Sequence, residues 1–217
     1  MSIDALVFDA YGTLYDVHSV ARRCEACFPG KGAALSQLWR AKQLEYTWQR
    51  SLMQRYAPFS TVTREALAYS CAALGLDGAP HLDALMAEYL ALAPFPEVPK
   101  ALSRLAVKKA ILSNGSPDLL DPLVRNSGLR FDAVLSVDEL RIYKPAPQVY
   151  ELAVRRLETP KARIGFVSSN CWDALGAKSF GLRVYWINRT GAPVDRLGFN
   201  PDREIRSLSE LVDEVLR

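Results

Sequence analysis

The sequence predicts an α/β fold with a parallel sheet, and the distribution of apolar patterns along its 217 residues indicates this. A short apolar run at residues 3–8, IDALVF, ends in DAYGTL, as a buried strand feeding a loop does. Near the middle of the chain, short apolar runs begin to alternate with helical patterns, which is typical of βα units on a parallel sheet. Between these regions the patterns are helical only. We therefore expect a sheet domain interrupted by helices.

Individual elements follow from the same patterns. Helical stretches fill residues 17–92, and the segment APFPEVP then breaks the pattern with three prolines, as a linker returning to another domain does. The tail at 207–217 predicts a closing helix, with Ser207 and Glu210 spaced as a capping box. Beyond the linker we expect strands within 107–114, 131–137, 163–170 and 183–189, and helices near 98–106, 117–127, 147–157 and 173–180.

Charge and hydropathy exclude several classes of partner. The formal net charge is +3, and charged residues of both signs are spread along the chain, so no basic stripe for nucleic acid or an anionic membrane is visible. We find no long uncharged apolar run, and Asp4 and Asp9 interrupt the N-terminal stretch that a signal peptide would need free of charge. We therefore expect a cytoplasmic protein with neither nucleic-acid nor membrane partners.

Cysteine and histidine give little support for metal or triad chemistry. Cys24 and Cys27 have the spacing of half a zinc site, but no second pair completes it, and four ordinary thiols are the better interpretation. His18 and His81 lie beside no plausible nucleophile, which disfavours a Ser-His-Asp or Cys-His mechanism.

Several polar side chains fall just past the ends of predicted strands. Because ligands bind open α/β sheets at the carboxyl ends of the strands, one crevice is expected to collect them. The alternative is that such residues only cap the helices that follow, as Ser116 before Pro117 or Asn170 before Asp173 would. The sequence leaves both interpretations open. The residues concerned are Asp9, Ser113, Ser168, Asn170 and Asn188.

Five blocks of sequence together resemble one known family. They are FDAYGTL, LWRAKQLEYTW, ILSNGSP, SVDELRIYKPAPQVYELA and FVSSNCWDALGAKSFG. The chain is similar to the haloacid dehalogenase superfamily and closely to its L-2-haloacid dehalogenase branch. This resemblance implies a Rossmann-like core formed by residues 1–15 and 94–217, an inserted all-helical cap formed by residues 16–93, and Asp9 as nucleophile.

Leaving-group chemistry explains the residue two positions after Asp9. Phosphatases of the superfamily carry an acid there, because an alkoxide leaving group must be protonated. This chain has Tyr11, a poor proton donor at neutral pH. A halide is a very weak base that needs no proton but does need a cationic or hydrogen-bonding cradle. The substitution therefore favours carbon–halogen cleavage.

The fourth motif leads to the same interpretation. Superfamily phosphatases hold Mg²⁺ there with an acid, whereas this chain has SSN, with Ser169 in the acid's place. A neutral hydroxyl replaces that charge poorly. We expect no metal and no cofactor.

The resemblance implies a mechanism and a set of site residues. Asp9 attacks C2 of a 2-haloalkanoic acid, forms an ester with inversion and releases halide, and water then hydrolyses the ester. The implied catalytic residues are Asp9, Thr13, Arg40, Ser113, Lys144, Tyr150, Ser168, Asn170 and Asp173. The implied substrate-binding residues are Tyr11, Arg40, Leu44, Phe59, Ser113, Asn114 and Trp172.

Other interpretations of these residues remain at this stage. From spacing alone, Arg40 would form an exposed ion pair, Leu44 would be core packing, Phe59 a loop anchor, Lys144 solvated and Tyr150 a buried helix residue. A metal-dependent phosphatase and a non-catalytic binding module are the competing functions. The resemblance also implies an L (S) substrate and a homodimer. Ala41 stands where some relatives carry glutamine, so one polar contact near the pocket is absent.

Overall fold

A computed structural model describes residues 3–215, and its centre is a six-stranded parallel sheet with strand order β3-β2-β1-β4-β5-β6. The predicted α/β class is confirmed. The last strand in the chain was not predicted, because it is three residues long and two of them are exposed. The strands are β1 Ala5–Phe8, β2 Lys108–Ser113, β3 Ala133–Ser136, β4 Ile164–Ser168, β5 Arg183–Ile187 and β6 Arg203–Ile205.

The central strands are apolar because helices cover both faces of the sheet. All four residues of β1 are fully buried, as is every residue of β4. Parallel strands buried on both faces lose the alternation of polar and apolar residues and become continuous apolar runs. The short runs found in the sequence are thus the middle of the sheet.

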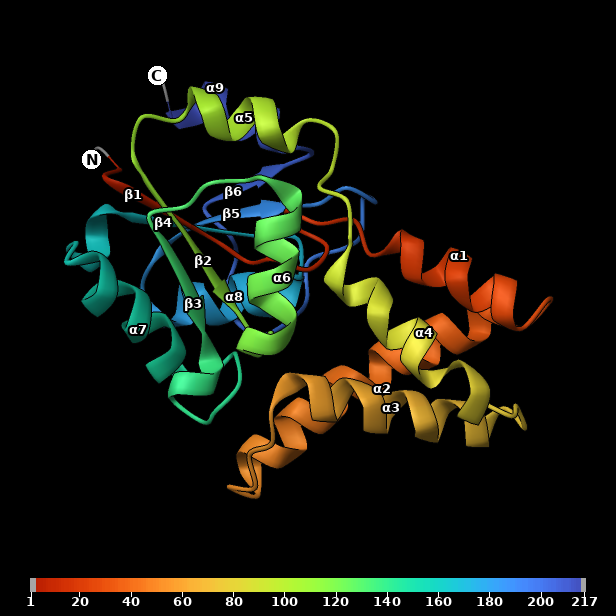
Figure 1. The fold of residues 1–217 in the computed structure, drawn as a ribbon. Helices are drawn as coiled ribbons and strands as arrows, with labels where there is room; N and C mark the ends of the chain where they lie inside the picture. The colour runs from red at the N-terminus through yellow and green to blue at the C-terminus, as the bar shows by residue number, and fades with distance from the viewer. Residues whose placement is uncertain (1–2, 216–217) are drawn as a thin grey trace.

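Five helices surround this sheet. In Figure 1, α5 and α9 lie on one side of it, and α7 and α8 lie on the other. The carboxylate of Glu210 accepts a hydrogen bond from the backbone N–H of Arg206 at 2.9 Å, one residue before the cap predicted at Ser207. The last two residues of the predicted tail helix lie outside the described residues. The helices are α5 Val98–Arg104, α6 Pro117–Ser127, α7 Pro147–Leu157, α8 Cys171–Phe180 and α9 Leu208–Val215.

Between residues 17 and 92 the regular elements are all helices, as predicted. Its helices lie together beside the sheet domain, with α2 packed against α1 and α3 (Figure 1). The α-helices are α1 His18–Cys27, α2 Gly32–Leu52, α3 Phe59–Ala73 and α4 Leu82–Ala87, and the short 3-10 helices of this segment are η1 Ala79–His81 and η2 Glu88–Leu90. Two more 3-10 helices, η3 Val137–Glu139 and η4 Lys161–Arg163, lie in the sheet domain.

The two connectors of the helical segment run side by side. The backbone N–H of Phe95 donates to the carbonyl of Leu14 at 3.0 Å, and the N–H of Asp16 donates to the carbonyl of Ala93 at 2.8 Å. The chain therefore leaves the sheet domain and returns to it at one place.

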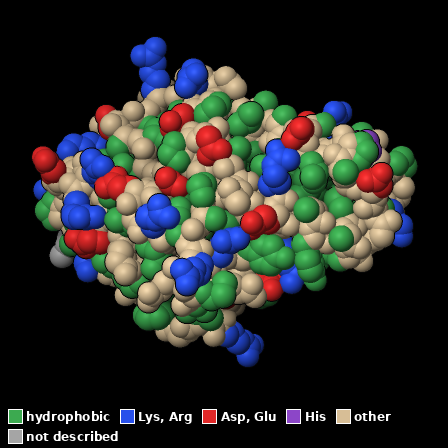
Figure 2. Space-filling model, turned by 60° about the horizontal axis from the view of Figure 1, so that its bottom comes forward, with side chains coloured by type: hydrophobic (Ala, Val, Ile, Leu, Met, Phe, Trp, Pro, Cys, Tyr) green, Lys and Arg blue, Asp and Glu red, His purple; other side chains and the backbone are tan. Residues whose placement is uncertain are grey.

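The surface carries mixed charge. Figure 2 shows Lys and Arg side chains interspersed with Asp and Glu over one face of the molecule. Within residues 3–215, no helix has the length and apolar character needed to cross a membrane. The four cysteines are free thiols.

Candidate active site

Asp9 lies at the carboxyl end of β1, and donors contact both of its carboxylate oxygens. Its Oδ1 accepts a hydrogen bond from the Lys144 ammonium at 3.1 Å. Its Oδ2 accepts from the Thr13 hydroxyl at 3.1 Å and from the Asn170 amide at 2.8 Å. Only 6% of Asp9 is exposed. These donors hold the carboxylate in one orientation, an arrangement that suits a nucleophile.

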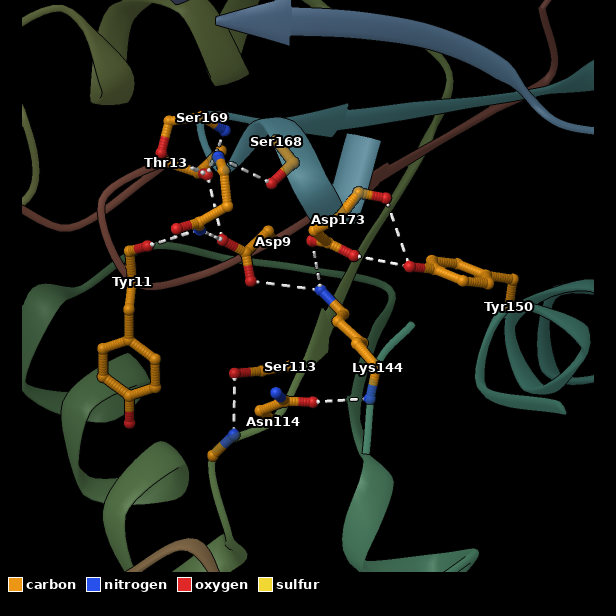
Figure 3. A network of polar contacts seen from close by, with 12 residues as sticks. Asp9, Tyr11, Thr13, Ser113, Asn114, Lys144, Tyr150, Ser168, Ser169 and Asp173 are labelled. Atoms are coloured by element: carbon orange, nitrogen blue, oxygen red, sulfur yellow. Dashed lines mark hydrogen bonds and ion pairs between the residues drawn. The ribbon is translucent and has the colours of Figure 1, made fainter. Parts of the chain in front are cut away.

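Lys144 joins Asp9 to a second buried acid, Asp173. Its ammonium lies 2.8 Å from Oδ2 of Asp173, and the Tyr150 hydroxyl donates to Oδ1 of Asp173 at 2.8 Å. Figure 3 shows Lys144 reaching between the two carboxylates while Tyr150 approaches Asp173 from the opposite side. Lys144 is 1% exposed and Asp173 is fully buried, so the interpretation of Lys144 as a solvated residue is wrong.

Burial and charge set the protonation of this group. Burial raises the pKa of Asp173 to about 6, although the Lys144 ammonium opposes that change. Burial alone would lower the pKa of Lys144, but the carboxylates of Asp173 and Asp9 raise it above its ordinary value. Burial also raises the pKa of Tyr150 well above its usual range, so its hydroxyl stays protonated as a donor.

The helix-capping interpretation fails at both positions where it was strongest. Asn170 stands at the N-cap of α8 but makes no side-chain cap, because its amide is directed to Asp9 instead. Ser116 stands at the N-cap of α6, and its hydroxyl accepts a hydrogen bond from the backbone N–H of Ser60 at 3.1 Å. These polar residues connect distant segments of the chain.

Arg40 comes from α2 and meets the sheet domain at Asn170. Its Nη2 donates to Oδ1 of Asn170 at 3.3 Å, and its Nη1 donates to Oε1 of Gln43 at 2.6 Å. The ion pair expected from spacing is not what holds it, because both acceptors are neutral amide oxygens. Asn170 thus contacts the nucleophile with one side of its amide and Arg40 with the other.

Thr13 fixes the loop that follows Asp9. Its hydroxyl donates to Asp9 and accepts a hydrogen bond from the backbone N–H of Ser169 at 2.8 Å. The hydroxyl of Ser169, the residue that the resemblance sets in place of the phosphatase acid, lies 3.2 Å from that of Thr13. The fourth motif is therefore tied to the first by hydroxyl and amide groups.

Three other predicted residues hold loops around the site. The hydroxyl of Ser113 accepts from the N–H of Gly115 at 3.0 Å. Oδ1 of Asn114 accepts from the N–H of Lys144 at 3.0 Å, and the Ser168 hydroxyl accepts from the N–H of Asn170 at 3.2 Å. In these contacts they position the backbone of other site residues.

Asn188 does not belong to this cluster, contrary to the single crevice expected from strand ends. Its amide donates to the carbonyl of Ala192 at 2.8 Å and to the carboxylate of Glu204 at 2.7 Å. It shapes the loop after β5, and in the sheet β4 lies between that strand and β1, which carries Asp9 at its end.

Aromatic rings pack beside the polar cluster. Tyr11 stacks on Phe59 with ring centroids 5.9 Å apart and meets Tyr89 edge-on at 5.7 Å. Its ring points away from the Asp9 carboxylate (Figure 3). The Tyr11 hydroxyl is buried and has no hydrogen-bond partner among residues 3–215.

Leu44 and Trp172 are two more residues that the resemblance implies for substrate binding. Leu44 is half-buried on α2. Trp172, at the start of α8, is also half-buried, and its ring packs edge-on against Trp48 at 5.5 Å.

Two residues of the site were missed in the sequence. Gln43 is fully buried on α2 and holds Arg40, and its one available signal was its position three residues after that arginine. Gly115 lies against Tyr11, where an added Cβ would stand 2.9 Å from the Tyr11 hydroxyl.

The donors around Asp9 suit an anion. Both of its oxygens face N–H or O–H groups, and a divalent cation placed there would meet the Lys144 ammonium. Within the described part of the chain, no group of three or more His, Cys, Asp or Glu side chains is arranged to hold a metal ion. Lys144 supplies the local positive charge.

Comparisons with known proteins identify the family of this chain. The model of a hydrolase family, haloacid dehalogenase-like hydrolase, matches residues 3–181. The (S)-2-haloacid dehalogenase of Pseudomonas sp. strain YL is 52% identical, over 97% of this chain and 94% of that protein.

Solved structures extend the similarity to three dimensions. The crystal structure of an L-2-haloacid dehalogenase matches with a TM-score of 0.98 and 47% identity over all of both chains. The Xanthobacter autotrophicus L-2-haloacid dehalogenase with covalently bound chloropropionic acid matches with a TM-score of 0.92 and 43% identity, over 99% of this chain and 98% of that one. With its sheet, helical insertion and buried Asp9 cluster, the chain belongs to the L-2-haloacid dehalogenase family of the haloacid dehalogenase superfamily.

Proposed function

We propose that the protein is an (S)-2-haloacid dehalogenase, which hydrolyses short L-2-haloalkanoic acids to D-2-hydroxyalkanoic acids with inversion at C2. One observation carries the proposal. The Asn170 amide lies between the Asp9 carboxylate, at 2.8 Å, and the Arg40 guanidinium, at 3.3 Å. An anionic nucleophile and a cation able to receive an anion therefore share one site. Relatives of 46–52% identity carry the same activity in their names.

The first step is displacement at saturated carbon. One oxygen of Asp9 forms a bond to C2 from the side opposite the halogen, and the electron pair of the carbon–halogen bond leaves with the halide. Arg40 receives that halide, since a guanidinium presents several N–H donors and a full positive charge. The covalent chloropropionic acid complex of the Xanthobacter autotrophicus protein supports an ester intermediate.

The second step is hydrolysis of the ester at the Asp9 carbonyl carbon. Water adds there, and the bond between that carbon and the substrate oxygen breaks, so the product hydroxyl keeps an oxygen from Asp9. We assign deprotonation of the water to Asp173, because a pKa of about 6 suits a general base near neutral pH. Lys144 stabilises the negative charge that develops on the Asp9 oxygen.

We assign the chain to two parts by the same reasoning. Residues 1–15 and 94–217 form the core that carries Asp9, Lys144 and Asp173, and residues 16–93 form the cap. Arg40 and Phe59 come from the cap segment, so the site is completed only when both parts meet.

A second copy of the chain is the partner we propose, as in the homodimer implied by the resemblance. Leu52 is 86% exposed and Met53 is 60% exposed at the end of α2, which leaves an apolar tip for contact. Light scattering of the purified protein tests this: a dimer mass is expected, and the Leu52→Lys variant should shift it toward the monomer. A monomer mass at all concentrations would contradict the proposal.

Halide release tests the function directly. Chelator-treated enzyme is incubated separately with L- and D-2-chloropropionate, and chloride is followed by ion chromatography. We expect release from the L substrate, D-lactate as product, and no release by the folded Asp9→Asn variant. Release from the D substrate alone would contradict the stereochemistry, and sustained turnover by Asp9→Asn would contradict the nucleophile.

A single turnover in ¹⁸O-water tests the ester. The label should enter Asp9, and the product hydroxyl should stay unlabelled. Label found directly in the product, with none in Asp9, would show that water attacks the substrate itself.

A further inference from the structure

Gln43 is a fully buried side chain that contacts Arg40 from within the same helix. It lies on α2 three residues after Arg40, and none of its surface is exposed. Its Oε1 accepts a hydrogen bond from Arg40 Nη1 at 2.6 Å. Its Nε2 donates to the Thr63 hydroxyl at 2.8 Å and lies 3.4 Å from the Tyr89 hydroxyl. Both ends of the amide are therefore engaged.

Thr63 determines which end of the amide faces Arg40. The Thr63 hydroxyl donates to the backbone carbonyl of Phe59 at 2.7 Å, so its proton is already committed. It can then only accept from Gln43, which places the NH₂ group of the amide toward Thr63 and the oxygen toward Arg40. A flipped amide would set its NH₂ group against the guanidinium.

Arg40 is held without being neutralised. Its acceptors are the amide oxygens of Gln43 and Asn170, and no carboxylate among residues 3–215 lies within ion-pair distance of it. A glutamate at position 43 would have the same shape and would pair with the guanidinium in a buried setting, where opposite charges interact strongly. Such a pair would compensate much of the positive charge before any halide arrived.

We propose that Gln43 is a positioning residue that presets the Arg40 guanidinium for the departing halide, and that its lack of charge keeps Arg40 an effective acceptor. This inference rests on the proposed function, in which Arg40 receives the halide. It assigns to Gln43 an effect on ester formation and none on ester hydrolysis, because the halide has left before the second step begins.

Three substitutions separate geometry from charge. Gln43→Glu keeps the shape and adds the opposing charge, Gln43→Met keeps the length and removes the hydrogen bonds, and Thr63→Val removes the acceptor that orients the amide. Thr63→Ser keeps this hydroxyl and should behave as the wild type does. The matched control is Ser70→Ala, which removes a fully buried hydroxyl of α3 that donates to the Ala66 carbonyl.

The readouts are single-turnover halide release from L-2-chloropropionate and L-2-bromopropionate, the decay of the trapped ester by mass spectrometry, and inhibition by added bromide. With Gln43→Glu, chloride release should slow about 100-fold, as when one transition-state donor is lost. With Gln43→Met it should slow about tenfold, as when the support of a reacting group is lost. Bromide release should slow less, because bromide is the better leaving group, and inhibition by bromide should weaken in both variants.

Decay of the ester should keep its wild-type rate in every folded variant, and Ser70→Ala should behave as wild type throughout. Equal losses for both halogens with unchanged bromide inhibition would show that Gln43 only supports the fold, and would overturn the inference. So would a Gln43→Glu enzyme of full activity. If Gln43→Glu does not fold, Gln43→Met and Thr63→Val decide by the same criteria. Absence of halide release from the wild-type enzyme would instead defeat the proposed function, and this inference with it.

Discussion

The Lys144 ammonium lies 2.8 Å from the carboxylate of Asp173, and both side chains are buried. The same ammonium lies 3.1 Å from Asp9, so one buried cation serves two acids. Two carboxylates this close repel one another unless a positive charge lies between them. We therefore expect the Lys144–Asp173 pair to determine both the stability of the site and the pH range over which the enzyme is active.

Removing the shared cation should destabilise the protein strongly. In Lys144→Met the two buried acids lose their counter-charge, and we expect the free energy of unfolding to fall by about 3–5 kcal/mol, with loss of halide release. Urea unfolding measures the first quantity. The double variant Lys144→Met/Asp173→Asn should recover part of the stability, because one of the uncompensated charges is gone.

A surface pair provides the control for that experiment. Lys178 bonds Asp202 at 2.6 Å, but both side chains are about one-third exposed, so Lys178→Met should cost at most about 1 kcal/mol. Equal destabilisation by Lys144→Met and Lys178→Met would contradict the assignment of Lys144 as a buried counter-ion.

Activity should fall as the pH decreases through about 6. Asp173, with its raised pKa, is ionised above that value and protonated below it, and the protonated acid neither accepts a proton from water nor pairs with Lys144. Halo acids remain ionised over this range, so the change in kcat reports the enzyme. The same raised pKa means that the folded chain binds this proton more tightly than the unfolded chain does. The contribution of Asp173 to stability is therefore greatest at acid pH and declines as the pH rises from about 4 to about 6.

The Tyr150→Phe variant tests the direction in which the fall of kcat at acid pH should move. The Tyr150 hydroxyl donates to the Asp173 carboxylate and so favours its charged form. Without the donor, the pKa of Asp173 rises and the acid limb of kcat should move to higher pH. A profile that stays flat down to pH 5, or a limb that moves to lower pH in the variant, would contradict this role.

Chelation should leave halide release unchanged. The donors around Asp9 are an ammonium, an amide and a hydroxyl, and Ser169 stands where a phosphatase carries its acid. Chloride release with EDTA and with added Mg²⁺ should agree, and phosphate esters should remain intact in both. Loss of dehalogenation on chelation, or phosphatase activity on adding Mg²⁺, would favour the competing function.

Tyr11→Phe should be harmless to both stability and catalysis. The Tyr11 hydroxyl is buried without a hydrogen-bond partner in the described chain, and burial raises its pKa above the usual range. Deleting an unpartnered buried hydroxyl should leave the free energy of unfolding unchanged or raise it by up to about 1 kcal/mol. Halide release should persist, since the variant keeps the ring that packs on Phe59 and Tyr89. A large loss of kcat would show that the hydroxyl takes part in the chemistry.

The sequence predicted the parts of the structure that depend on local patterns. Strands buried on both faces, such as β1 and β4, are continuous apolar runs, and the helical segment showed helical periodicity throughout. The short β6 was not predicted, because its sequence REI has only one apolar residue. This segment is a strand because it pairs with β5. Pairing of that kind depends on tertiary contacts.

Contacts between the site residues could not be predicted from local sequence patterns. Asn170 and Ser116 both carry the signature of an N-cap, yet Asn170 contacts residues 130 and 161 positions away, and Ser116 bonds a residue 56 positions away. The burial of Gln43 depends on how α2 packs against α3 and η2, which its position on the helix does not reveal. Asn188 was expected in the site because it follows a predicted strand, but the order of the strands places the end of β5 away from Asp9.

The two connectors, which run side by side, make the helical segment a closed insertion in the sheet domain. Leu14 bonds Phe95 and Asp16 bonds Ala93, so the two ends of the helical segment are held together by backbone hydrogen bonds. The sheet domain is therefore connected to this segment at one point, as two strands are connected by a hairpin turn. The entropy of closing a loop grows only slowly with its length, so such a junction tolerates segments of very different size. A helical segment of another length can therefore join the sheet domain at the same junction and leave Asp9, Lys144 and Asp173 in place.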